Sequence, residues 1–237
     1  MQLFYHPKAS TLLPEIFFSK EESKHIIKVL RKNIGDILEI TNGKGSFFTA
    51  EITQANPNKC FAKITEEFPQ KPLSYHLHLA VAPTKLNDRF EWFLEKATEI
   101  GISEITPIFC ERSERKNIKP ERFEKIIQSA MKQSLKGFLP ILHPAISFKE
   151  FVLQQKNNSS KKYIAHCEDT DRKPLKKEIQ AKDSIVILIG PEGDFSEKEI
   201  TYALTNRFVP ITLGESRLRT ETAAVVACHS VAFLNEN

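Results

Sequence analysis

Two glycine-bearing turns near the C-terminus carry the residue types best suited to chemistry. The first is "IGPEGDFSEKEI" (189–200) and the second is "LGESRLRTETAAV" (213–225). Neither fits the phosphate-binding pattern G-x-x-x-x-G-K-[ST] or the dinucleotide pattern G-x-G-x-x-G. Glu192 and Asp194 would also repel a phosphate held by backbone amides. The first turn therefore favours a ligand with neutral polar edges or positive charge.

The second turn carries two arginines. Arg217 and Arg219 flank Leu218, and the following Thr220 is predicted to be the N-cap of a last helix. An arginine beside a helix N-terminus can receive an anion or stabilise a developing negative charge. An alternative is that Arg219 and Glu221 form only a structural ion pair.

Alternating strands and helices are expected to position these turns. Prolines and polar residues at 69–75 mark a boundary between two patterns. Before it, Ser19 and Glu22 form a capping box for a helix over 20–33. That helix is followed by strands at 36–41, 46–53 and 59–66, with a turn at 42–45. Residues 1 to about 70 thus form a small, mainly β module.

After the boundary, strands are predicted at 76–82, 104–109, 162–167, 184–190 and 209–214. Helices are expected to begin at Asp88, at Pro120 and at the Ser196–Glu199 capping box, and glycines at 101 and 137 to close the first two. Such alternation is typical of an α/β protein with a parallel sheet covered on both faces. Ligands of these sheets bind at the carboxyl ends of the strands, where both turns lie.

Two further segments are expected to be buried. The last segment, "ETAAVVACHSVAFL", is apolar nearly all round and should pack against other elements, and Trp92 is assigned to the core. His166 and Cys167, at the end of a strand, are expected to line the pocket or pack rather than to catalyse.

Composition is that of an ordinary soluble protein. The chain has 237 residues, 41% hydrophobic and 27% charged, and its net charge is +4. It contains no apolar run of membrane-spanning length, and its N-terminus lacks the features of a secretory signal, so we expect a cytoplasmic protein with no membrane partner. Its four cysteines form no C-x-x-C pair and its histidines no H-E-x-x-H, so we expect no metal.

Positive charge gathers at residues 112–136, where eight Lys and Arg face three Glu. This stretch is either an electrostatic footprint for a polyanion or a solvated helix face.

The two turns together resemble the C-terminal motifs of the bacterial 16S ribosomal RNA (uridine-N3)-methyltransferase family, the RsmE type of the SPOUT class. The resemblance extends along nearly the whole chain. "HIIKVLRKNIGDILEITNGKG" (25–45) is similar to that family's PUA-like RNA-binding module. "KLNDRFEWFLEKATEIGISEITPIFCERSE" (85–114) and "SAMKQSLKGFLP" (129–140) are similar to its methyltransferase segments.

The resemblance implies a PUA-like β-barrel over residues 1–70 and a SPOUT methyltransferase domain over 71–237, with a trefoil knot at the carboxyl end of its sheet. It implies a homodimer that uses S-adenosylmethionine and acts on ribosomal RNA or the small ribosomal subunit. The implied cofactor-binding residues are Ile189, Gly190, Pro191, Glu192, Gly193, Leu213, Gly214, Ser216, Leu218, Thr222 and Ala223.

The chain departs from the family pattern at three positions. Ser216 stands where an arginine is common, with Arg217 displaced by one position. Asp194 replaces a usual glycine, and Gln2 replaces a frequent basic residue.

Catalysis at uridine N3 needs an unpaired base, loss of the imide proton and stabilisation of charge on the uracil carbonyls. We assign that positive charge to Arg219 with Arg217 as partner, and Glu221 orients Arg219 or receives the proton. The residues predicted to bind RNA, mainly through phosphates, are Arg31, Lys85, Arg89, Arg112 and Arg115.

Two alternatives stay open. One is a SPOUT methyltransferase that acts on another RNA nucleotide. The other is a non-catalytic RNA-binding factor for ribosome assembly that uses the basic surface without a cofactor.

Overall fold

The computed structural model describes residues 2–13, 15–168 and 171–236. Two compact units make up the chain. The first consists of Met1–Pro72 together with Gln128–Leu139, and the second of Leu73–Ile127 together with Pro140–Asn237.

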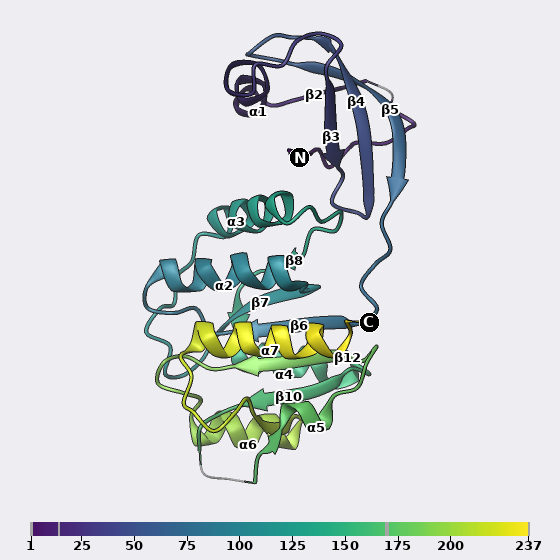
Figure 1. Cartoon of the computed structure of the whole chain (residues 1–237). Coiled ribbons are helices and arrows are strands. Elements are labelled where there is room, and N and C mark those ends of the chain that lie inside the picture. The colour runs from purple at the N-terminus through teal and green to yellow at the C-terminus, as the bar shows by residue number, and fades with distance from the viewer. Residues whose placement is uncertain (1, 14, 169–170, 237) are drawn as a thin grey trace. The chain divides into compact units, whose positions relative to one another are not determined.

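A curled five-stranded sheet forms the first unit, in the order β1-β3-β4-β5-β2 (Figure 1). Its strands are β1 (Leu3–Tyr5), β2 (Glu15–Phe17), β3 (Ile37–Thr41), β4 (Ser46–Gln54) and β5 (Phe61–Pro69). The inward side chains, among them Phe4, Ile40 and Phe48, form a core with Ile26 from the helix. The three predicted strands are confirmed, whereas β1 and β2 escaped prediction because three residues are too few to show an alternating pattern.

The helix of the first unit is shorter than predicted. α1 covers Lys20–Lys24 and continues as a π-helix over His25–Val29, and Arg31 then takes a left-handed φ of 56°. Ser19 caps the helix as expected, since its side chain accepts a hydrogen bond from the Glu22 amide at 3.2 Å.

The predicted turn between β3 and β4 also binds the segment that follows α3. Gly43 and Gly45 have φ values of 71° and 98°. The Gly45 amide donates to the Gly137 carbonyl at 2.8 Å, and the Leu139 amide donates to the Gly43 carbonyl at 2.9 Å. A Cβ at position 45 would lie 2.2 Å from the ring of Phe138, so this turn requires glycine for space as well as for φ.

The second unit contains an eight-stranded sheet with the path β11-β13-β10-β12-β6-β7-β8, while β9 pairs with β7. All of these strands pair in parallel, which confirms the predicted α/β sheet. The strands are β6 (His76–Val81), β7 (Glu104–Phe109), β8 (Ile141–Leu142), β9 (Ile146–Ser147), β10 (Lys161–Ala165), β11 (Lys173–Pro174), β12 (Ser184–Ile189) and β13 (Val209–Thr212).

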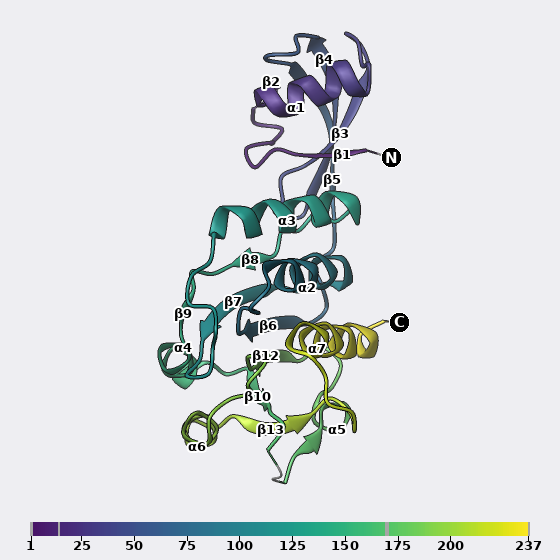
Figure 2. The same cartoon turned by 90° about the vertical axis from the view of Figure 1, so that its left-hand side faces the viewer.

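Helices cover both faces of this sheet, as predicted. Figure 2 shows α2, α7 and α5 on one side and α4 and α6 on the other. The bounds are α2 (Asn87–Ile100), α3 (Pro120–Gln133), α4 (Phe148–Gln154), α5 (Leu175–Glu178), α6 (Glu197–Thr205) and α7 (Thr220–Leu234), and a 3-10 turn covers Gln155–Asn157. On the α4 and α6 side, Phe148, Phe151 and Phe195 pack against Val186 and Leu188 of β12.

Helix ends agree with the sequence only in part. The Ser196–Glu199 capping box of α6 is confirmed, and so is Gly101 at the end of α2, with φ of 132°. The predicted cap at Asp88 is wrong: Leu86 is the N-cap, and Asp88 lies in the first turn, where its charge still favours the helix dipole.

The predicted end of α3 at Gly137 is also wrong. The helix stops at Gln133, and Leu135 takes the left-handed conformation with φ of 54°.

Two burial predictions fail as well. Trp92 is 44% exposed rather than in the core, because the inward face of α2 is already filled by Phe90, Phe93 and Leu94. α7 buries only one side, against α2 and the sheet, and Phe233 near its end is 66% exposed.

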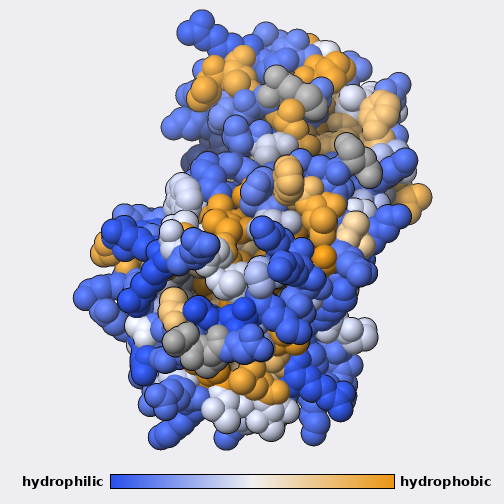
Figure 3. All heavy atoms as spheres, turned by 60° about the horizontal axis from the view of Figure 1, so that its bottom comes forward, coloured by the Kyte–Doolittle hydropathy of each residue, from blue (hydrophilic) through white to orange (hydrophobic). Residues whose placement is uncertain are grey.

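In the part of the chain that the structure describes, no helix has the length and apolar character needed to cross a membrane. The face drawn in Figure 3 is mainly hydrophilic, with hydrophobic atoms in separate patches.

Candidate functional site

Three loops meet at the carboxyl edge of the sheet in the second unit. β13, β10 and β12 are neighbours in that order and run in parallel, so the segments that follow them emerge side by side. The loop after β12 starts at Gly190, and the loop after β13 leads through Gly214 to Arg219. The sequence therefore placed both turns correctly.

Two adjoining cavities of about 540 and 410 Å³ lie among these loops. Both are lined by Ala165, Cys167, Arg217, Leu218 and Ala223.

The predicted cofactor-binding residues divide between the cavities. Ile189, Gly190, Pro191 and Glu192 line the smaller cavity only. Leu213, Gly214 and Ser216 line the larger cavity only. Leu218 and Ala223 line both, whereas Gly193 and Thr222 line neither.

Asp194 connects two of the loops. Its Oδ2 atom accepts a hydrogen bond from the Cys167 amide at 2.7 Å, and its Oδ1 atom accepts one from the Phe195 amide at 2.8 Å. The residue has φ of 62°, a left-handed conformation that Asp tolerates better than most side chains. The Asp194 side chain therefore joins the β10 and β12 loops.

The start of α7 is attached to the end of β12. The Thr220 hydroxyl donates to the Gly190 carbonyl at 3.0 Å. Thr220 is thus not the helix cap that the sequence predicted; Arg219 occupies the N-cap position, without a capping side-chain bond. A Cβ on Gly190 would lie 3.1 Å from the Phe195 ring, so the close approach at this turn favours glycine.

Two arginines predicted to bind RNA hydrogen-bond to backbone carbonyls. Arg112 donates from Nη1 to the carbonyls of Gly193 at 3.0 Å and Phe195 at 3.3 Å. Arg115 donates from Nη2 to the Lys85 carbonyl at 2.7 Å. These guanidinium groups hold the loops that border the cavity.

Lys85 is held from both its backbone and its side chain. Its amide donates to Glu192 Oε1 at 2.9 Å, and its ammonium pairs with Glu114 at 2.8 Å.

Arg217 and Arg219 are exposed and reach the cavity, while the nearby Glu221 is buried. Arg217 lines both cavities and Arg219 the smaller one, which Arg89 also lines. Glu221 Oε1 lies 3.9 Å from Arg89 Nε, and its Oε2 has no hydrogen-bond partner among the described residues. The alternative in which Arg219 and Glu221 form a structural ion pair is therefore wrong, because Glu221 pairs with Arg89.

His166 lines the larger cavity, as expected, and so does Cys167. His166 is 4% exposed, and neither ring nitrogen has a hydrogen-bond partner within the described chain. Burial lowers the pKa of His166, the charge of Asp194 opposes that shift, and the charge of Arg172 adds to it. His166 is thus neutral at pH 7, with one donor and one acceptor free for a ligand.

The sequence missed Arg172, which also lines the larger cavity and donates to the His166 carbonyl at 2.7 Å. It follows a strand end by several residues and belongs to no motif, so only the tertiary structure identifies it.

The carboxyl edge of the sheet thus offers backbone polar groups, a neutral imidazole and exposed arginine side chains around two adjoining cavities that are large enough for a small-molecule ligand. The acidic Glu192 and Asp194 side chains line the smaller cavity, and each also accepts a hydrogen bond from a backbone amide that helps to shape the loops.

Comparison with known proteins gives two family matches along the chain. Residues 70–232 match the RNA methyltransferase domain, and residues 18–65 match the RNA methyltransferase PUA domain. The chain belongs to the RNA methyltransferase family.

A relative in Buchnera aphidicola subsp. Acyrthosiphon pisum, named ribosomal RNA small subunit methyltransferase E, is 35% identical over 227 residues, which are 91% of this chain and 87% of that protein. The proposed resemblance to this type of enzyme is thus confirmed.

Solved structures of family members are similar over the whole chain. A probable rRNA-methyltransferase from Porphyromonas gingivalis is 40% identical with a TM-score of 0.91, and 99% of this chain and 98% of that one are covered. The ribosomal RNA small subunit methyltransferase E of Neisseria gonorrhoeae, solved bound to S-adenosyl methionine, is 27% identical with a TM-score of 0.88 and the same coverage.

Proposed function

We propose that the chain transfers a methyl group from S-adenosylmethionine to N3 of a uridine in small-subunit ribosomal RNA. The observation that carries this proposal is the pair of adjoining cavities at the carboxyl edge of the sheet, built from the two turns that resemble the family's cofactor loops. Family membership and the names of the relatives support the reaction and its substrate.

The residues of the cavity fit such a cofactor. The buried His166, whose ring nitrogens have no partner among the described residues, is a polar partner for the ligand, and the glycines at 190 and 214 expose backbone groups to it. We propose that Ile189–Glu192, Leu213, Gly214, Ser216, Leu218 and Ala223 contact the cofactor directly. Gly193 and Thr222 line neither cavity, so we propose that they act indirectly: Gly193 through the conformation of its loop and Thr222 through the start of α7.

When bound, S-adenosylmethionine would supply its sulfonium methyl group to uridine N3, with S-adenosylhomocysteine as the leaving group and the imide proton released to water. The protein must hold the uracil in line with this methyl group. Arg219, at the N-terminus of α7 and on the wall of the smaller cavity, stabilises the negative charge on the uracil carbonyls. Arg217, which lines both cavities, is its partner.

Glu221 receives a revised role in this proposal. Its nearest cation is Arg89, so it orients Arg89 at the cavity wall, whereas Arg219 stays free to meet the substrate. As proton acceptor it is disfavoured, since it does not line either cavity.

RNA binding is assigned to Arg31, Lys85, Arg89, Arg112 and Arg115, through phosphates. Arg89 is the best placed of these, whereas the hydrogen bonds of Arg112 and Arg115 also shape the loops. We propose residues 1–70 as a PUA-like β-barrel domain for RNA and 71–237 as the methyltransferase domain, in a cytoplasmic protein. The family matches support this division, and the compact first unit also takes in Gln128–Leu139.

A trefoil knot and a homodimer complete the proposal. After β12 the chain passes through α6 to β13 on the far side of β10, then returns to start α7 against the end of β12. That return path supports a knot around the loops. The exposed Phe233 and half-exposed Val225 and Val226 on α7 support a second subunit there.

The deciding experiment is mass mapping of small-subunit ribosomal RNA from a strain that lacks the gene, with and without the gene restored. We expect one methyl group on uridine N3 to be absent in the strain that lacks the gene and present again when the gene is restored. Loss of a methyl group from another nucleotide would support the alternative SPOUT activity instead.

Calorimetry with S-adenosylmethionine tests the non-catalytic alternative. Micromolar or tighter binding at one molecule per chain is expected, and no binding would leave only an RNA-binding assembly factor.

A further inference from the structure

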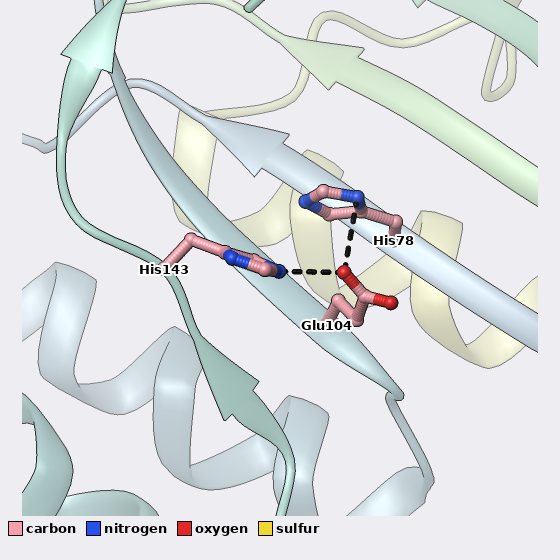
Figure 4. Close-up of side chains that lie close together, drawn as sticks. All are labelled: His78, Glu104 and His143. Carbon is pink, nitrogen blue, oxygen red and sulfur yellow. Dashed lines mark hydrogen bonds and ion pairs between the residues drawn. The ribbon is translucent and has the colours of Figure 1, made fainter. Parts of the chain in front are cut away.

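At the opposite edge of the same sheet, three side chains from three separate segments converge (Figure 4). His78 comes from β6, Glu104 from the start of β7, and His143 from the segment after β8. Glu104 Oε2 lies 2.5 Å from His143 Nε2 and 3.6 Å from His78 Nδ1. One ligand atom from each residue lies within 4.8 Å of the other two.

Neighbouring groups fix the orientation of this triad. The other nitrogen of His78, Nε2, is hydrogen-bonded to the Thr106 hydroxyl at 2.7 Å, which directs Nδ1 toward Glu104. The other oxygen of Glu104, Oε1, contacts His76 Nε2 at 2.9 Å. Supporting bonds of this kind are typical of histidine and carboxylate ligands in metal sites.

We propose that His78, Glu104 and His143 bind a divalent transition-metal ion, with Zn²⁺ the best match. Two imidazoles and one carboxylate are a ligand set that Zn²⁺ accepts, and a water molecule or the nearby His76 supplies a fourth position. The cavity of about 430 Å³ beside the triad leaves room for that fourth ligand.

The spacing of the three ligand atoms is near that of ligands around a single ion. Zn²⁺ bonds of about 2.0–2.2 Å in a tetrahedron place neighbouring ligand atoms roughly 3.3 Å apart. The 3.6 Å between Glu104 Oε2 and His78 Nδ1 is close to that value, whereas the Glu104–His143 pair, hydrogen-bonded at 2.5 Å, would separate by less than about 1 Å to admit the ion. At 3.6 Å, His78 Nδ1 makes no direct hydrogen bond with the carboxylate, so this pair gains from an ion between them.

The position of the triad indicates a structural ion. β6 and β12 run in parallel, and His78 pairs with Val186, three residues before the end of β12. Because a strand rises about 3.3 Å per residue, the triad lies roughly 10 Å along the sheet from the edge that holds the cofactor loops. The ion would join β6, β7 and the segment between β8 and β9, two short strands that each pair with β7 through two residues.

From the sequence alone we expected no metal, and the fold explains why such a site escapes sequence motifs. Short motifs such as C-x-x-C detect ligands that are close in sequence. Here the ligands are separated by whole helices, and parallel pairing of β6 with β7 and of β7 with β8 brings them together.

Cobalt and zinc binding to the full, tag-free chain test the site, after dialysis against a chelator. We expect one Co²⁺ per chain, with the intense visible bands of a four-coordinate ion, and displacement by Zn²⁺. With Zn²⁺ at one hundred times its Kd, the midpoint of thermal unfolding should rise by about 5–10 °C.

Absence of stoichiometric binding at micromolar cobalt would overturn the proposal. So would a sulfur-to-cobalt charge-transfer band, which would place the ion at a cysteine.

Variants locate the ion. His143→Gln and Glu104→Gln should each weaken Zn²⁺ binding at least tenfold, whereas His229→Gln, on the exposed side of α7, should not change it. Circular dichroism checks that each variant is folded, and the cobalt spectrum of the wild-type chain decides the matter even if one is not. Equal zinc affinity in folded His143→Gln and wild type would exclude this triad.

Discussion

The two edges of the parallel sheet differ in whether their buried polar groups have partners. At the carboxyl edge, His166 has both ring nitrogens unpartnered and Glu221 has one unpartnered oxygen, among the residues described. At the amino edge, both oxygens of Glu104 are in contact with histidines. Unpartnered polar atoms at the carboxyl edge can bind an organic ligand, whereas the paired groups of the amino edge, with the proposed ion or without it, hold segments of the fold together.

Energetics agree with this contrast. A buried polar atom without a partner costs about 1–3 kcal/mol. Burial opposes ionisation of Glu104, yet the hydrogen bond from His143 and the charges of His78 and His76 outweigh it and hold its pKa below the usual value. At the amino edge, the three histidines thus compensate the partly buried charge of Glu104. The carboxyl edge retains a cost that a bound ligand can relieve.

The largest expected effect is at the carboxyl edge. Arg219→Ala should lower single-turnover methylation by about a hundredfold, the loss typical of one charge-stabilising group, and leave the Kd for S-adenosylmethionine within about twofold. Rapid-quench assays and calorimetry measure the two quantities, and Lys198→Ala on α6 is a charge-matched control. Equal losses of rate and cofactor affinity would show that Arg219 binds the cofactor rather than the transition state.

The loop connection made by Asp194 should give the next effect. Asp194→Ala removes two hydrogen bonds to backbone amides and keeps a left-handed φ, so it should lower the free energy of unfolding by about 3 kcal/mol. Asp194→Gly should recover about 1 kcal/mol of that loss, because glycine adopts the conformation without strain. Urea titrations measure both variants. If alanine and glycine are equally unstable, the left-handed φ carries no strain.

A matched pair of carboxylates compares the two edges directly. Glu104→Gln weakens contacts with three histidines and should lower the free energy of unfolding by about 1–2 kcal/mol. Glu221→Gln removes a charge that pairs with Arg89 only at 3.9 Å and whose Oε2 has no partner among the described residues, so the free energy of unfolding should change by less than about 0.5 kcal/mol. Chemical denaturation of both variants in the presence of a chelator measures the two losses of unfolding free energy. A larger loss for Glu221→Gln than for Glu104→Gln would contradict the proposed difference between the two edges.

The smallest effect concerns pH. Burial lowers the pKa of His166 in the folded chain, so as the pH falls below about 6.5 the unfolded chain takes up a proton on this imidazole more readily than the folded chain does. The folded state therefore keeps its full stability with respect to His166 above about pH 6.5 and loses stability as the pH falls below it. The difference in unfolding free energy between wild type and His166→Asn should therefore shrink from pH 7 to pH 5, by at most about 1.4 kcal/mol per pH unit. A constant difference would mean that the imidazole is not desolvated.

The features that could be predicted from the sequence are those that depend only on residues close together in the chain. The long apolar run of β12 and the capping box of α6 were both recognisable, because period and spacing are local properties. Strands such as β8 and β11, with two residues each, have no period to detect. The N-caps at Leu86 and Arg219 have no capping side chain and so no signature.

The same distinction holds at the site. The two turns and their arginines were found from residue type and from resemblance, and the cavities lie among them. The connection from Asp194 to Cys167, the bond from Thr220 to Gly190 and the pairing of Glu221 with Arg89 join residues far apart in sequence. Only the tertiary fold determines such partners, so no local pattern contains them.

The backbone hydrogen bonds that join Gly45 to Gly137 and Gly43 to Leu139 have a consequence for the order of synthesis. A ribosome releases the chain from its N-terminus, so the β3–β4 turn emerges long before its partners exist. Until residue 139 has left the exit tunnel, the first unit lacks its last backbone bonds, and the Gly45 amide must remain hydrated. Maturation of the N-terminal sheet is thereby coupled to translation of the first helices and strands of the second unit.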